Sequence, residues 1–77
     1  MNVAIIGVGY VGLVSGVCLA TKGHNVTCYD KNNLIINKLN SGTPTIYEKG
    51  LSKLLKDVIK KGKFSATNNF IKAISDA

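Results

Sequence analysis

The chain has 77 residues, of which 45% are hydrophobic and 18% charged, proportions that exclude a disordered chain. Its net charge of +6 comes from ten lysines and no arginine. Bidentate phosphate and base contacts favour arginine, and aromatic residues do not alternate with the lysines. We therefore expect a solvated lysine face and no nucleic-acid partner.

The first 21 residues carry no charged side chain, but four glycines interrupt them and no lysine or arginine precedes them. This pattern favours neither a signal peptide nor a membrane span. Cys18 and Cys28 form no C-x-x-C pair, and the single His24 cannot complete a zinc site. We therefore expect no metal, two small buried cysteines in a reducing compartment, and a cytoplasmic protein.

The chain begins with an apolar, β-branched run, residues 3–6, which is typical of a parallel strand covered on both faces. Residues 7–12 then match the pattern G-x-G-x-x-G, and a helical pattern covers residues 13–22. A second β-type run over residues 25–29 leads to Asp30. The order strand, glycine turn, helix, strand and acid predicts a unit that binds a dinucleotide.

Each glycine of this motif has a physical role in that hypothesis. Gly7 allows a sharp turn after the strand, Gly9 lets the backbone approach a pyrophosphate, and Gly12 lets the helix pack closely on the strand. The first amides of the helix, with its positive dipole end, then face the phosphates. The alternative is a glycine-rich turn that holds no ligand.

Asp30 follows Gly12 at close to the spacing of about 20 residues that is expected for an acid on the adenosine ribose. Its carboxylate can accept hydrogen bonds from the ribose diol, and it would repel a 2′-phosphate. The sequence therefore predicts NAD as the cofactor, in preference to NADP. The alternative is an aspartate that only caps the next helix.

The middle of the chain predicts two further helices. Asn32 or Asn33 can cap a short one, which ends at a turn over residues 41–44. A loop over residues 45–50 follows. The clearest amphipathic helix comes next, with its apolar positions at helical spacing: Leu51, Leu54, Leu55, Val58 and Ile59.

The last segment predicts a short strand over residues 64–67 and a final helix that Asn68 or Asn69 can cap, carrying Phe70, Ile71 and Ile74. Because parallel strands need right-handed crossovers, we predict an α/β fold, the first half of a Rossmann-type doubly wound parallel sheet. Its three strands should have the order 3-2-1. Residues 1–77 are then expected to be the N-terminal part of an NAD-binding domain, without a substrate domain. The unpaired edge of the first strand predicts a homodimer.

Four stretches of the sequence resemble a known family, the UDP-glucose/GDP-mannose dehydrogenases. They are residues 7–20, 23–30, 38–42 and 44–51, and the likeness around them extends over essentially the whole chain. Within the family, residues 13–16 (LVSG) and 46–48 (IYE) are most similar to members that oxidise UDP-glucose.

The resemblance implies an enzyme that oxidises the C6 alcohol of UDP-glucose to UDP-glucuronate with two NAD, through a thiohemiacetal on a cysteine. The family's catalytic cysteine, lysine and asparagine have no counterpart in these 77 residues, so the chain alone should contain no catalytic residue and be inactive. Tyr47 and Glu48 are interpreted as loop-packing residues rather than as an acid and a base.

The resemblance also implies which residues bind the cofactor. Members often carry a lysine or arginine at the position of Ile35, and Lys31 is the candidate to replace it here. The expected cofactor-binding residues are therefore Gly7, Gly9, Tyr10, Val11, Gly12, Asp30 and Lys31. Two alternatives remain open: a 6-dehydrogenase for GDP-mannose or another nucleotide sugar, and a non-enzymatic module that senses NAD.

Overall fold

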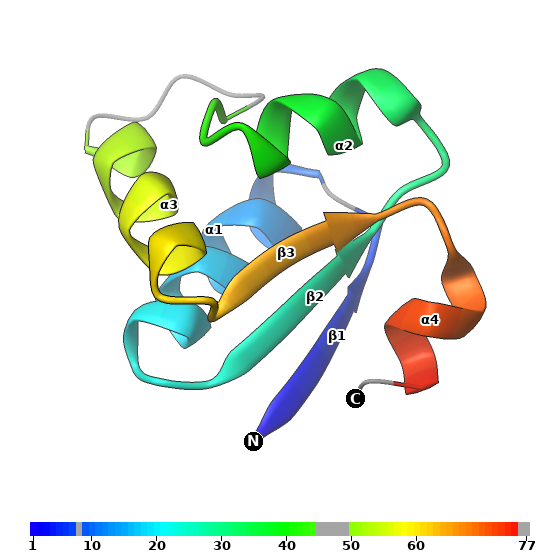
Figure 1. Cartoon of the computed structure of the whole chain (residues 1–77), viewed down its shortest axis with the longest axis horizontal. Helices are drawn as coiled ribbons and strands as arrows, with labels where there is room; N and C mark the ends of the chain where they lie inside the picture. Colours follow the sequence, from blue (N-terminus) through cyan, green and yellow to red (C-terminus); the bar gives the residue numbers. More distant parts are fainter. Residues whose placement is uncertain (8, 45–49, 76–77) are drawn as a thin grey trace.

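The computed structural model describes residues 1–7, 9–44 and 50–75. In these ranges, three strands form one parallel sheet in the order β1-β2-β3 (Figure 1). The predicted α/β class and the predicted strand order are both confirmed. The strands are β1 (Asn2–Ile6), β2 (Asn25–Tyr29) and β3 (Phe64–Thr67).

Four helices accompany the sheet in the described ranges, as the sequence predicts. The first begins at Tyr10, earlier than the predicted start at residue 13, because Gly9 already occupies the N-cap position with an extended backbone. None of the helices in these ranges is long and apolar enough to cross a membrane. They are α1 (Tyr10–Thr21), α2 (Asn33–Asn40), α3 (Leu51–Lys60) and α4 (Phe70–Ser75).

The two faces of the sheet carry different helices. Alternate strand residues point to opposite faces, and the buried Val26, Cys28 and Phe64 lie in one core cluster with side chains of α1, α2 and α3. On the other face, the ring of Tyr29 meets the ring edge of Phe70 in α4, with centroids 5.3 Å apart. Helices α1 to α3 therefore cover one face, and α4 crosses the other (Figure 1).

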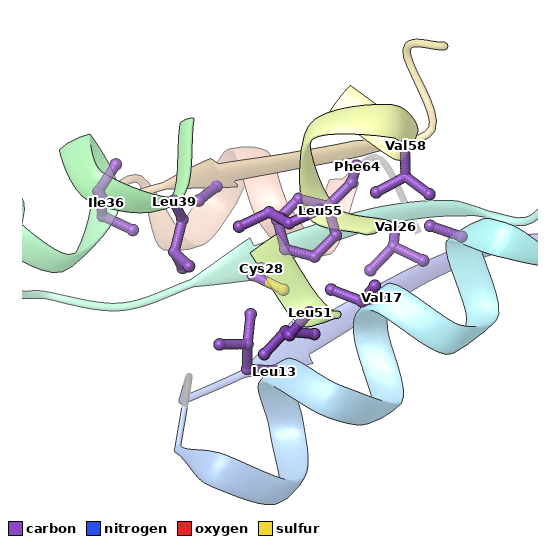
Figure 2. Close-up of a cluster of buried hydrophobic side chains, with 12 residues drawn as sticks. Leu13, Val17, Val26, Cys28, Ile36, Leu39, Leu51, Leu55, Val58 and Phe64 are labelled. Carbon is purple, nitrogen blue, oxygen red and sulfur yellow. The ribbon is translucent and has the colours of Figure 1, made fainter. Parts of the chain in front are cut away.

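The core lies between the sheet and helices α1 and α3 (Figure 2). Its largest fully buried side chains come from all three helices of this face and from β2: Leu13, Leu39, Leu55, Val17, Val58 and Cys28. Helix α1 approaches the sheet closely at Gly16, where an added Cβ would lie 3.4 Å from atoms of Cys28, Phe64 and Val26. An alanine at position 16 would make ordinary van der Waals contacts, whereas a side chain larger than alanine would extend into these strand residues.

Two of the residues predicted to be buried on this face are exposed. Cys18 is exposed because Leu13 and Val17 define the buried face of α1, and residue 18 falls outside that face. Leu54 is 45% exposed because Leu55 and its helical neighbours occupy the core position of α3. The prediction that Cys28 is buried is confirmed.

Helix α4 also differs from its predicted apolar face. Ala73 is its fully buried residue, whereas Ile71 and Ile74 are 66% and 45% exposed. The helix has only six residues, and the β3 strand beneath it carries the polar residues Ser65 and Thr67. The sheet therefore buries only the side of α4 that carries Ala73. Asn69 caps the helix, because its Oδ1 accepts a hydrogen bond from the Lys72 amide at 3.0 Å.

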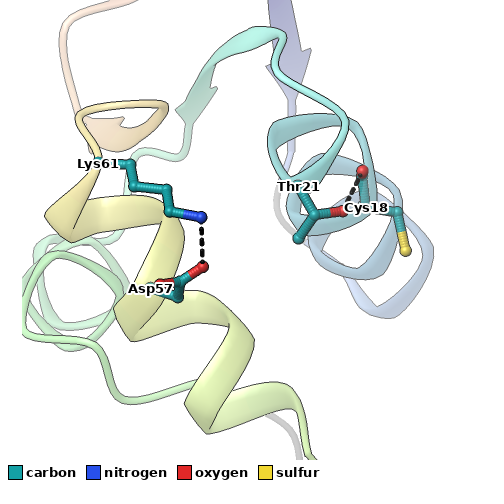
Figure 3. Close-up of polar contacts among 4 residues, drawn as sticks. All are labelled: Cys18, Thr21, Asp57 and Lys61. Carbon is teal, nitrogen blue, oxygen red and sulfur yellow. Dashed lines mark hydrogen bonds and ion pairs between the residues drawn. The ribbon is translucent and has the colours of Figure 1, made fainter.

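The C-terminal ends of α1 and α3 carry local polar contacts (Figure 3). The Thr21 hydroxyl donates to the Cys18 carbonyl at 2.7 Å, within the last turn of α1. At the end of α3, Lys61 Nζ lies 3.1 Å from Asp57 Oδ2, and both side chains are at least half exposed. An exposed ion pair of this kind contributes only about 0.2–1 kcal/mol, so the position of α3 depends mainly on its buried apolar face.

The two edges of the sheet are protected differently. At the β3 edge, the Asn40 side chain accepts from the Ala66 amide and donates to the Ala66 carbonyl, both at 2.9 Å. This side chain takes the place of a neighbouring strand. At the other edge, the backbone of β1 pairs only with β2 in the described ranges. Such an unpaired edge is a template for another chain.

We predict that the 77-residue chain forms a dimer through this β1 edge. Gly7 N donates to Tyr29 O and Asn25 N donates to Met1 O, so odd-numbered residues face β2 and the backbone of Ala4 faces outward. Ala4→Pro should therefore remove an outward N–H while sparing the pairing with β2.

Sedimentation equilibrium at micromolar concentration checks this prediction. The unmodified chain should have the mass of a dimer, and Ala4→Pro should have the mass of a monomer with unchanged helix content by circular dichroism. A monomeric unmodified chain would contradict the prediction.

Candidate nucleotide-binding site

The predicted site residues meet at the carboxyl edge of the sheet. The turn after β1 lies beside the end of β2, because the Gly7 amide donates to the Tyr29 carbonyl at 2.9 Å. Asp30 comes next in the chain, and its own amide donates to the Thr67 carbonyl of β3 at 3.2 Å. Ligands of open α/β sheets bind outside the carboxyl ends of the strands, which is where these residues lie.

Two glycines shape the turn between β1 and α1. Gly7 has a φ of +84°, a backbone conformation that residues other than glycine rarely adopt. The sharp turn predicted there is therefore present. At Gly12, an added Cβ would lie 2.8 Å from the Gly7 carbonyl oxygen and 3.2 Å from Ile5 Cγ2. Close contact between α1 and β1 therefore requires glycine at position 12, and it places the start of α1 over the end of β1.

Gly9 faces open space. A Cβ added there would meet no atom within 4 Å, and its φ of −80° is available to any residue. Glycine at this position is therefore needed neither for the fold nor for the backbone conformation of the described chain. Its effect is to leave the backbone accessible to a group from outside, as the pyrophosphate hypothesis requires.

The start of α1 suits a negative group. Its N-cap is Gly9, which has no side chain to accept hydrogen bonds from the amides of the first turn, and this turn contains no acidic residue. Tyr10 and Val11 begin the helix, and the Val11 side chain is 74% exposed. Amides at a helix start and the positive end of the helix dipole favour phosphate. The open cradle at Gly9 and this uncapped start together fit a pyrophosphate.

Asp30 is half-buried, and its carboxylate is held in one orientation. Its Oδ1 accepts a hydrogen bond from the Asn32 amide at 2.9 Å. The N-cap of α2 is Asn32, whose Oδ1 accepts from the Leu34 amide at 2.9 Å and the Ile35 amide at 3.4 Å. The alternative in which Asp30 itself caps α2 is therefore wrong.

The two residues weighed for the adenosine end of the site lie in different surroundings. Lys31 is exposed directly after Asp30, at the carboxyl edge. Ile35 is partly buried and packs against the hydrophobic core. A side chain at position 35 in this structure therefore contributes to folding, and Lys31 is the lysine that follows the acid in the chain.

The sequence reasoning missed a contact that extends this edge toward β3. Asn68, directly after β3, donates from its side-chain amide to Oδ1 of Asn33 in the first turn of α2. Pairs of asparagines follow β2 and β3, at positions 32–33 and 68–69. They were a signal in the sequence, but they were interpreted only as helix caps. The carboxyl edge thus carries a glycine turn, an aspartate and an asparagine pair in spatial order.

Other candidate chemistry lies away from this edge or outside the described residues. Burial raises the pKa of the Cys28 thiol to about 12, so this cysteine stays protonated and unreactive at neutral pH. Among the described residues, no three side chains of His, Cys, Asp or Glu lie close enough together to hold a metal ion. Tyr47 and Glu48 lie outside the described residues.

The fold and this edge define a βαβ unit that binds a dinucleotide. The sequence profile of the UDP-glucose/GDP-mannose dehydrogenase family, NAD binding domain, matches residues 1–77. The chain therefore belongs to this family, and it corresponds to the family's NAD-binding domain.

Individual relatives agree with this assignment. The UDP-glucose 6-dehydrogenase of Rickettsia conorii is 42% identical over 77 residues, which are 100% of this chain and 18% of the relative. The GDP-mannose 6-dehydrogenase of Pseudomonas savastanoi pv. phaseolicola is 40% identical over 74 residues, which are 96% of this chain and 17% of the relative. The chain thus spans less than a fifth of the length of these relatives.

A solved structure has nearly the same backbone. The crystal structure of GDP-mannose dehydrogenase from Pseudomonas aeruginosa superposes with a TM-score of 0.96 and is 39% identical, over 100% of this chain and 18% of that one. UDP-glucose and GDP-mannose enzymes are thus similar to this chain to nearly the same degree.

The two motif glycines at positions 9 and 12 should respond differently to alanine. Gly12→Ala forces a Cβ against the Gly7 carbonyl and should lower the free energy of unfolding by about 1–3 kcal/mol. Gly9→Ala adds a methyl group to open space at an ordinary φ, and the entropic gain from alanine is opposed by the preference for glycine over alanine at an N-cap. The free energy of unfolding should therefore change by less than about 1 kcal/mol. Urea denaturation of the matched pair measures both values, and equal losses would contradict the packing described for Gly12.

Gly9→Val should abolish NAD binding without unfolding the chain. The two added methyl groups would occupy the open space over the turn, where a pyrophosphate would have to approach the backbone. The φ of −80° is compatible with valine, so helix content should be nearly unchanged. Calorimetric titration with NAD, alongside circular dichroism, gives both quantities. NAD affinity retained in a folded Gly9→Val protein would remove the role proposed for this turn.

Proposed function

We propose that this chain is the NAD-binding segment of a UDP-glucose 6-dehydrogenase, an enzyme that oxidises UDP-glucose to UDP-glucuronate with two NAD. The observation that carries the NAD part is the position of Asp30 at the end of β2, beside the glycine turn. The UDP-glucose part is supported by the 42% identity to the Rickettsia enzyme and by residues 13–16 and 46–48, of which the second set lies outside the described residues.

In this proposal each site residue acts on a different part of the cofactor. The pyrophosphate is held by the backbone around the motif, at Gly7, Gly9, Tyr10, Val11 and Gly12. Asp30 accepts hydrogen bonds from the adenosine ribose, and Lys31, the next residue in the chain, supplies the cation at the adenosine end. NAD, when bound, supplies the hydride acceptor. The chain itself orients the cofactor and contributes no catalytic residue, so the 77 residues alone should form no NADH. We propose that the full-length protein is cytoplasmic, because the Cys28 thiol is free.

A second candidate function has a specific observation in its favour. The GDP-mannose 6-dehydrogenase of Pseudomonas savastanoi is 40% identical to this chain, almost as similar as the UDP-glucose enzymes. The two functions are separated by steady-state assays of the full-length protein with UDP-glucose and GDP-mannose. A higher kcat/KM for UDP-glucose supports our proposal, and a higher value for GDP-mannose replaces it. NAD binding without turnover of any nucleotide sugar would instead indicate an NAD-sensing module.

We predict that the full-length protein prefers NAD to NADP by about tenfold or more, because the Asp30 carboxylate would repel a 2′-phosphate. Asp30→Ala should weaken NAD binding by about 1.5–3 kcal/mol, the range for a hydrogen bond to a charged group, and should narrow the preference. Dissociation constants for both cofactors check this, and Asp57→Ala, on the exposed surface of α3, is the matched control. Equal use of both cofactors by the unmodified protein would refute the role of Asp30.

A further inference from the structure

The carboxyl edge continues beyond Asp30 to a pair of asparagines that the proposed NAD site does not yet use. Asn68 follows β3 directly, and Asn33 lies in the first turn of α2. Both side chains are exposed, and the Asn68 side chain donates a hydrogen bond to Asn33 Oδ1. The contact joins two segments that are distant in the chain.

The position of this pair follows from the sheet order. Along the edge, the turn at Gly7 ends β1, Asp30 ends β2, and Asn68 follows β3. In the adenosine half of NAD, the pyrophosphate, the ribose and the base follow one another in the same way. With the pyrophosphate at Gly7 and the ribose at Asp30, a base that continues in this direction would lie toward β3. Asn68 follows Thr67, whose carbonyl accepts from the Asp30 amide.

The hydrogen bond between the two side chains leaves an acceptor oxygen on Asn68 and a donor amide on Asn33. The existing bond uses one Asn68 N–H and Asn33 Oδ1. Within the described part of the chain, Asn68 Oδ1 and the Asn33 Nδ2 amide make no further hydrogen bond. Adenine presents the complementary groups, the N6 amino donor and the N7 acceptor.

We propose that Asn33 and Asn68 recognise the adenine base, so that they select adenine nucleotides over those with a 6-oxo purine. The proposal rests on the NAD site at Gly9 and Asp30. Asn68 Oδ1 accepts from the N6 amino group, and Asn33 Nδ2 donates to a ring nitrogen. Hypoxanthine carries an oxygen in place of the amino group, and this oxygen would face Asn68 Oδ1 with no proton between them.

The substitution Asn33→Asp separates base recognition from folding. An aspartate at position 33 can still accept the hydrogen bond from Asn68, and a negative charge in the first turn of α2 favours the helix. Of the two hydrogen-bonding groups of Asn33, the substitution keeps the acceptor oxygen and removes the Nδ2 donor. Asn37→Asp places the same charge on the same helix at an exposed position, without the contact to Asn68, and is the matched control.

The experiment measures the binding of ADP and of IDP, its hypoxanthine analogue, to the 77-residue chain by equilibrium dialysis. A βαβαβ half of this fold binds a mononucleotide, so the chain contains the strands that such a ligand needs. The unmodified chain and Asn37→Asp should bind ADP about five- to tenfold more tightly than IDP. Asn33→Asp should abolish or reverse this preference, and Asn68→Ala should reduce it while thermal stability stays unchanged.

The outcomes separate this inference from the proposed function. ADP binding that depends on Gly9 and Asp30, with the same ADP-to-IDP ratio in Asn33→Asp as in the control, would overturn the role of the asparagine pair alone. No ADP binding by the folded unmodified chain would overturn the site itself, and the base recognition with it. Loss of preference in Asn33→Asp but not in Asn37→Asp would support the proposal.

Discussion

The structure depends on one close contact, that of Gly12 in α1 with the end of β1. Because an added Cβ at this position would lie 2.8 Å from the Gly7 carbonyl oxygen, only glycine allows the helix to start directly over the strand end. The same contact sets the direction of α1, so that Gly16 and Val17 meet the sheet further along. Packing and binding therefore share a cause: the geometry that buries α1 also presents its uncapped first turn at the carboxyl edge.

Polar groups fix two other parts of the structure, the β3 edge of the sheet and the acid after β2. Asn40 closes the β3 edge by bonding both backbone groups of Ala66, and Asn32 caps α2 while its amide orients Asp30. A side-chain amide suits the first task because it carries both a donor and an acceptor. The second task uses the backbone N–H of Asn32. The acid at the end of β2 is thus held by a backbone amide of the segment that leads into α2.

The sequence predicted the elements, their order and the glycine geometry because these follow from local patterns: apolar runs, helical spacing and the G-x-G-x-x-G motif. The prediction of buried residues was wrong where burial depends on the width of the helix face that the rest of the protein covers. Cys18 and Leu54 flank the buried faces of α1 and α3, and Ile71 lies on a helix that only its Ala73 side anchors. The Asn33–Asn68 contact was missed for a different reason, since it joins the first turn of α2 to the residue after β3, and only the parallel sheet brings these segments together.

The groups that we assign to NAD lie at strand ends that are hydrogen-bonded to one another. Each strand ends at the same edge, and each end is tied to its neighbour: Gly7 to Tyr29, and Asp30 to Thr67. The groups that we assign to NAD therefore sit on backbone that the sheet already holds, rather than on a long loop. Ordering them on binding costs little conformational entropy, which is the condition under which a few polar contacts can give selectivity.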